Sequence, residues 1–111
     1  MSRRLQPLDA VALAAAVEAG DRRALTKHYL AVLESRAPGK SVEVRIPPYA
    51  AIQCIEGVRH TRGTPPAVIE TDPDTWIAVA SGALAWADAV ASGKVRVSGE
   101  RTDLSTHLPL S

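Results

Sequence analysis

The stretch from residue 72 to residue 99 reads DPDTWIAVASGALAWADAVASGKVRVSG and holds the clearest start and stop signals of the chain. Asp72 followed by Pro73 indicates a helix start, because a carboxylate can cap free amides and proline fits the first helical position. Trp76 begins an apolar pattern at helical spacing, and Gly82 is a typical helix stop. The pattern therefore predicts a short helix that begins at Asp72 and ends at Gly82.

A second short helix and a strand complete this stretch. Trp86 and Val90 lie four residues apart, which places them on one helical face, and Gly93 ends the pattern. The residues after Gly93 alternate between polar and apolar types, which is typical of a half-buried strand. We expect Val95 and Val97 to point inward from this strand.

The upstream sequence contains two helical patterns and then three strand patterns. The expected helices cover residues 8–19 and 21–36, the expected strands cover 41–47, 51–57 and 67–70, and a brief last helix covers 103–108. Because strands joined by short turns pair antiparallel, we expect a β-meander, with the later strand joining the same sheet. The fold class is thus α+β, a small, mostly antiparallel sheet with helices packed on one face.

Length and composition indicate a single domain and exclude several classes of protein. The 111 residues suit one domain, with a helical part over 1–38 and a sheet-plus-helix part over 40–111. The formal net charge is +1 with both signs interspersed, so we expect no nucleic-acid partner. No apolar run approaches the ~20 residues of a membrane span, so we expect no stable membrane insertion and a cytoplasmic protein.

The residues of the 72–99 stretch resemble the signature region of the sterol carrier protein type 2 family. The matching positions are Asp72, Trp76, Gly82, Ala89, Ser92, Gly93, Lys94, Val95, Val97 and Gly99. The order of helices followed by strands also fits that family, and the chain looks most similar to its short actinobacterial members. The resemblance implies a fold in which the two short helices and the last strand form one wall of an apolar tunnel.

The resemblance also implies the binding of fatty acyl groups, sterols or other lipids without covalent chemistry. Apolar side chains from the sheet, the two short helices and the C-terminal end are the candidate tunnel lining. They are Ile52, Trp76, Val79, Trp86, Val90, Leu104 and Leu108. The competing interpretation is that Trp76 and Trp86 are ordinary core residues in a chain with no phenylalanine.

Polar residues suggest one weak head-group site and no catalytic or metal site. Arg59 and Arg62 could hold an anionic head group at a tunnel mouth, since arginine suits bidentate recognition of carboxylates and phosphates; a solvated loop is the alternative. Cys54, the only cysteine, could be a nucleophile with His60 as its base, but it lies within an apolar strand pattern and no third group would orient the pair. The three histidines match no zinc spacing, so we expect no metal, no cofactor and no enzymatic activity.

Two functions remain open at this point. The first is a binding module that holds a hydrophobic small molecule or lipid in an apolar cavity. The second is a structural or interaction protein that keeps the fold while Trp86 and its neighbours fill the tunnel. Such a protein would act through a homodimer or a partner enzyme.

Overall fold

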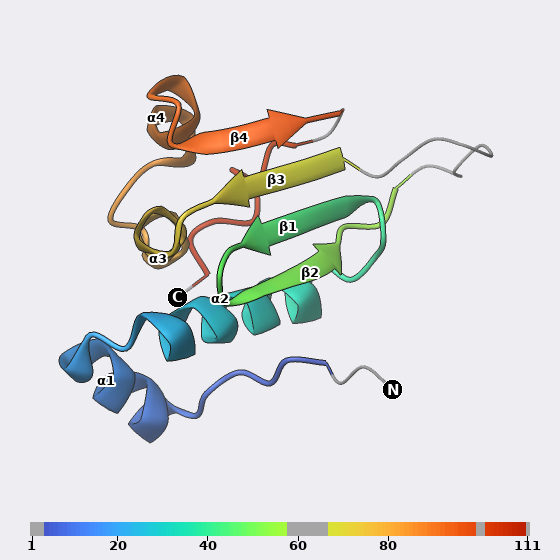
Figure 1. The fold of residues 1–111 in the computed structure, drawn as a ribbon. Coiled ribbons are helices and arrows are strands. Elements are labelled where there is room, and N and C mark those ends of the chain that lie inside the picture. Colours follow the sequence, from blue (N-terminus) through green and yellow to red (C-terminus); the bar gives the residue numbers. More distant parts are fainter. Residues whose placement is uncertain (1–3, 58–66, 100–101, 111) are drawn as a thin grey trace.

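The computed structural model describes residues 4–57, 67–99 and 102–110, and these residues form an α+β fold with a four-stranded sheet (Figure 1). This confirms the fold class expected from the sequence. The elements are α1 (Ala10–Ala19), α2 (Arg22–Arg36), β1 (Val42–Ile46), β2 (Ala50–Cys54), β3 (Ala67–Thr71), α3 (Pro73–Ser81), α4 (Trp86–Ala91) and β4 (Val95–Ser98).

Three helices begin, and two of them end, at capping signals that the sequence contains. The side chains of Asp9, Asp21 and Asp72 each accept a hydrogen bond from a backbone amide in the first turn of α1, α2 and α3. Gly20 and Gly82 follow α1 and α3 in the left-handed conformation that favours glycine. Local capping chemistry therefore sets these boundaries.

The sheet is mixed, which corrects the expected β-meander. Its strand order is β2-β1-β3-β4, and β1 pairs antiparallel with β2 but parallel with β3. β4 then pairs antiparallel with β3, so most pairings are antiparallel. The strands β2 and β3 are joined by residues 55–66, which is too long a connection for a tight hairpin. β2 ends and β3 begins beside the start of β1, and β1 lies between them.

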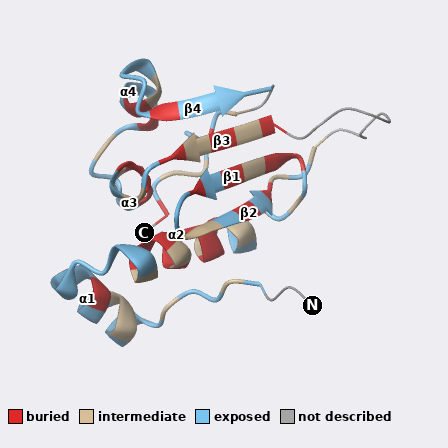
Figure 2. Cartoon of the chain, viewed as in Figure 1, coloured by how far each residue is buried: buried red, intermediate tan, exposed pale blue. Residues whose placement is uncertain are grey.

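One face of the sheet is buried and the other is partly exposed (Figure 2). Alternate residues of β1, β2 and β3 are buried, as the pleat predicts for a sheet with one face in the core. The buried strand residues are Val42, Val44, Ile46, Ile52, Cys54, Ala67, Ile69, Thr71 and Val95. In the helical layer, α2 contacts α3 and β2, while α1 is mostly exposed.

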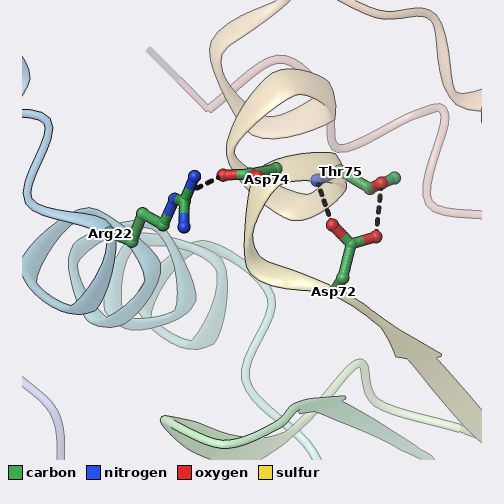
Figure 3. Close-up of polar contacts among 4 residues, drawn as sticks. All are labelled: Arg22, Asp72, Asp74 and Thr75. Atoms are coloured by element: carbon green, nitrogen blue, oxygen red, sulfur yellow. Dashed lines mark hydrogen bonds and ion pairs between the residues drawn. The ribbon is translucent and has the colours of Figure 1, made fainter.

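The start of α3 is fixed by two groups of polar contacts (Figure 3). Asp72 accepts hydrogen bonds from the Thr75 amide at 3.1 Å and from the Thr75 hydroxyl at 2.5 Å. Partial burial by itself raises the pKa of Asp72, but these hydrogen bonds outweigh it and lower the pKa below its ordinary value. Arg22 of α2 reaches Asp74 at 2.9 Å, although both side chains are largely exposed and the pair contributes little stability.

The C-terminal segment, residues 102–110, is an irregular chain rather than the expected helix over 103–108. Residues 105–107 form a turn, and the segment returns from β4 to α3 (Figure 1). Leu104 and Leu110 are buried, and the Leu110 amide donates a hydrogen bond of 2.7 Å to the carbonyl of Ala80. These two anchors lie too far apart in the chain for one short helical face, and Pro109 interrupts a helix between them.

Within the described ranges, no helix is both long and apolar enough to cross a bilayer.

Candidate functional site

The first hollow of interest lies between α4, β4 and the C-terminal segment, and we call it the β4 hollow. Its volume is about 410 Å³. Its lining consists of Trp86, Ala87, Val90, Ala91, Val97, Thr102, Asp103 and Ser105. One face of α4 and the edge strand form an apolar body, while the C-terminal segment forms a polar end.

A second hollow lies at the start of α4 and extends to the end of α3; we call it the α3 hollow. Its volume is about 320 Å³. Its lining consists of Val79, Gly82, Leu84, Ala85, Trp86, Ala87, Ser105, Leu108 and Pro109. The two hollows share Trp86, Ala87 and Ser105, so they adjoin at the start of α4. Together they form the α4 groove.

The structure divides the residues expected to line a tunnel into two groups. Val79, Trp86, Val90 and Leu108 line the α4 groove. Ile52, Trp76 and Leu104 lie in the buried core cluster and outside both linings.

The two tryptophans have different surroundings. Trp76 is 1% exposed, and its indole Nε1 donates a hydrogen bond of 3.3 Å to the Thr26 carbonyl, which links α3 to α2. Trp86 is 8% exposed and borders both hollows. Within the described ranges, the indole N–H of Trp86 has no protein acceptor. Trp76 therefore fills the interior, whereas Trp86 borders open space.

Val97 points inward with Val95, as the sequence predicts, but the residue is 41% exposed. Val97 lies opposite Ile69 in the β3–β4 register, so it does belong to the core face of the sheet. It remains exposed because it forms the floor of the β4 hollow at an edge strand. The signal that could have identified this part of the site is a large apolar residue, Val97, on an edge strand.

Sequence reasoning also missed the polar end of the β4 hollow, which is formed by Thr102, Asp103 and Ser105. The Ser105 amide donates a hydrogen bond of 2.8 Å to Asp103 Oδ1. Hydrogen bonds from the Ser105 side chain and backbone lower the pKa of Asp103, so this carboxylate is ionised at neutral pH. Asp103 reaches the groove because of the path that residues 102–110 take in the folded chain, and no local sequence pattern reveals that path.

The expected head-group residues, Arg59 and Arg62, lie outside the described residues. Two other hollows, of about 260 and 320 Å³, lie around Pro47 and Glu70. Their linings include charged side chains such as Arg45 and Arg96. Such linings are less suited to an apolar chain than the α4 groove is.

Burial shifts the pKa values of two ionisable side chains, Cys54 and His28. Burial, followed by the charge of Glu34, raises the pKa of Cys54 to about 12, so the thiol is not a ready nucleophile. His28 Nδ1 accepts a hydrogen bond of 2.9 Å from the Leu8 amide, and burial lowers the pKa of this imidazole. The described part of the chain holds no group of three His, Cys, Asp or Glu residues that could bind a metal.

Both hollows lie inside the region of the chain that a protein-family model matches. A family model described as "Bacterial SCP ortholog" matches residues 18–110, which include every element from α2 to β4 and the C-terminal segment. No curated protein matches the chain. The chain therefore belongs to the family of bacterial orthologs of the sterol carrier protein.

Proposed function

We propose that this protein binds a hydrophobic ligand, a fatty acyl or similar lipid chain, in the α4 groove without chemical change to the ligand. The observation that carries the proposal is the position of Trp86 at the junction of two adjoining hollows. Membership of a family of lipid-carrier type supports the same function. Val79, Val90 and Leu108 would contact the chain on the two sides of the junction.

The driving force would be removal of apolar surface from water. Each buried methylene contributes about 0.8 kcal/mol, so a chain of several methylenes can offset the loss of translational and rotational freedom. The open groove would also allow the ligand to enter and leave without unfolding of the core. Both properties suit a carrier, which must release what it binds.

Single-tryptophan variants test the site directly. Trp76→Phe leaves Trp86 as the only indole, and Trp86→Phe leaves Trp76. On titration with dodecanol, we expect the emission of Trp86 to shift in Trp76→Phe and that of Trp76 to stay constant in Trp86→Phe. Circular dichroism of both variants checks that the fold is intact. A shift reported by Trp76 alone, or no shift in either protein, would contradict the proposed site.

The alternative function is a structural or interaction role through a homodimer or a partner enzyme. The specific observation in its favour is that Trp76 and its neighbours fill the interior between α2 and α3. Native mass spectrometry of gently purified protein separates the two functions. Co-purifying lipid supports the carrier, whereas a ligand-free dimer supports the interaction role.

A further inference from the structure

The β4 hollow has one apolar end and one polar end, which is the arrangement expected for an amphiphile. Trp86, Val90 and Val97 form the apolar body. Asp103 and Ser105, on the C-terminal segment, form part of the polar end. A ligand that lays its chain along α4 would therefore bring its head group close to the Asp103 carboxylate.

Asp103 is the one charged side chain among the described residues that line the α4 groove. Its Oδ1 accepts a hydrogen bond from the Ser105 amide at 2.8 Å, which holds the carboxylate in place. The ordinary carboxylate has about four lone-pair sites, so further donors can still be accommodated. No cation of the described lining offsets the negative charge.

We propose that Asp103 makes the α4 groove selective for amphiphiles whose head group donates a hydrogen bond, such as a hydroxyl or a primary ammonium, over free fatty acids. The inference rests on the proposed function, because it concerns the ligand class of the same groove. A hydroxyl or ammonium can donate to the free lone pairs of Asp103, and an ammonium also gains from the opposite charge. A fatty-acid carboxylate places a like charge beside Asp103 and cannot donate.

The expected difference in affinity between an alcohol and a fatty acid is set by the repulsion between Asp103 and the ligand carboxylate, which water partly screens. At about 4 Å, two unit charges interact by an amount that changes affinity about five-fold in bulk water and more where the protein lowers the dielectric. Because Asp103 is exposed, we expect dodecanoate to bind about five- to ten-fold more weakly than dodecanol at low salt. Dodecylammonium should bind at least as well as dodecanol.

The test is a calorimetric or fluorescence titration of the full chain with these three ligands, which share one chain length, below their aggregation limits. Asp103→Asn keeps an oxygen that can accept from the Ser105 amide but removes the charge. This variant should bring the affinities for dodecanol and dodecanoate to within about two-fold of each other, given the loss of the charge pair. Asp88→Asn is the matched control, since Asp88 is exposed on α4 and lies outside both linings. It should keep the wild-type preference.

A change of salt concentration gives a second test on the wild-type protein, without any substitution. Raising the salt concentration to about 1 M shortens the screening length to about 3 Å and should narrow the gap between dodecanol and dodecanoate. Equal binding of dodecanol and dodecanoate by the wild-type chain, or the same change in both variants, overturns the role of Asp103 and leaves the proposed function standing. Failure of all three ligands to bind overturns the proposed function and this inference with it.

Discussion

Trp76 and Trp86 lie on consecutive helices, yet the molecule uses them in opposite ways. Trp76 is sealed between α3 and α2, where its indole donates to the Thr26 carbonyl and nearly all of its surface is buried. Trp86 begins α4, a helix of six residues, and borders two adjoining hollows. Among the described residues, the contact between α2 and α3 around Trp76 is thus buried, whereas the α4–β4 side borders open space. Stability and ligand binding should therefore respond to different substitutions.

The largest expected effect is on stability, and it should distinguish the two tryptophans. Trp76→Ala should lower the free energy of unfolding by about 3–5 kcal/mol, because it leaves a closed cavity in packed surroundings. Trp86→Ala should cost less, about 1–3 kcal/mol, because water can enter a space that adjoins open hollows. Urea unfolding of both variants measures the difference. Equal losses would mean that the two sides of the molecule are packed alike.

The next effect concerns binding at nearly constant stability. Val97→Lys should weaken dodecanol binding at least ten-fold, about 1.4 kcal/mol, because it places a charge on the floor of the β4 hollow. Since Val97 is already 41% exposed, the free energy of unfolding should change by no more than about 0.5 kcal/mol. Val11→Lys is the control, since Val11 lies on α1 and is 82% exposed. If both variants bind like the wild type, the β4 hollow is not the site.

The smallest expected effect is a pH dependence of stability, which arises from His28 in α2. Burial holds the pKa of His28 below its ordinary value of 6.5, so the unfolded chain takes up a proton at a higher pH than the folded chain does. As the pH falls below 6.5 towards the lowered folded value, stability should decrease by at most about 1.4 kcal/mol per pH unit, the limit for one proton. Thermal unfolding between about pH 7 and pH 5 measures this decrease.

His28→Asn is the informative comparison for this prediction. Asparagine offers an oxygen that can accept from the Leu8 amide in place of Nδ1, but it does not titrate. The variant should therefore show a flatter pH dependence of stability. An unchanged slope would assign the effect to other groups.

Much of the fold could be predicted from the sequence because its signals are local. The caps at Asp9, Asp21 and Asp72 act within one turn, and the alternation in β1 gives the buried face directly. The parallel pairing of β1 with β3 could not be predicted in the same way. It depends on where the chain re-enters the sheet after residues 55–66, which no local pattern specifies.

The candidate site was predictable only in part. Apolar periodicity identified Trp86 and Val90 as side chains on one helical face, but it gave Trp76 the same expectation. Periodicity reports that a side chain faces the interior and does not report what occupies the far side. Asp103 was missed because its approach to α4 depends on the return path of the C-terminal segment.

The sequence by itself determined where α1, α2 and α3 begin, which face of β1 is buried, and the family resemblance of the region that begins at Asp72. These depend on capping, backbone preference and side-chain period, which act between near neighbours. Only the tertiary structure decided which tryptophan is enclosed, why Val97 meets solvent and how an acidic residue comes to lie beside an apolar groove. Empty space is formed by surfaces from distant parts of the chain, so it exists only after those parts have packed.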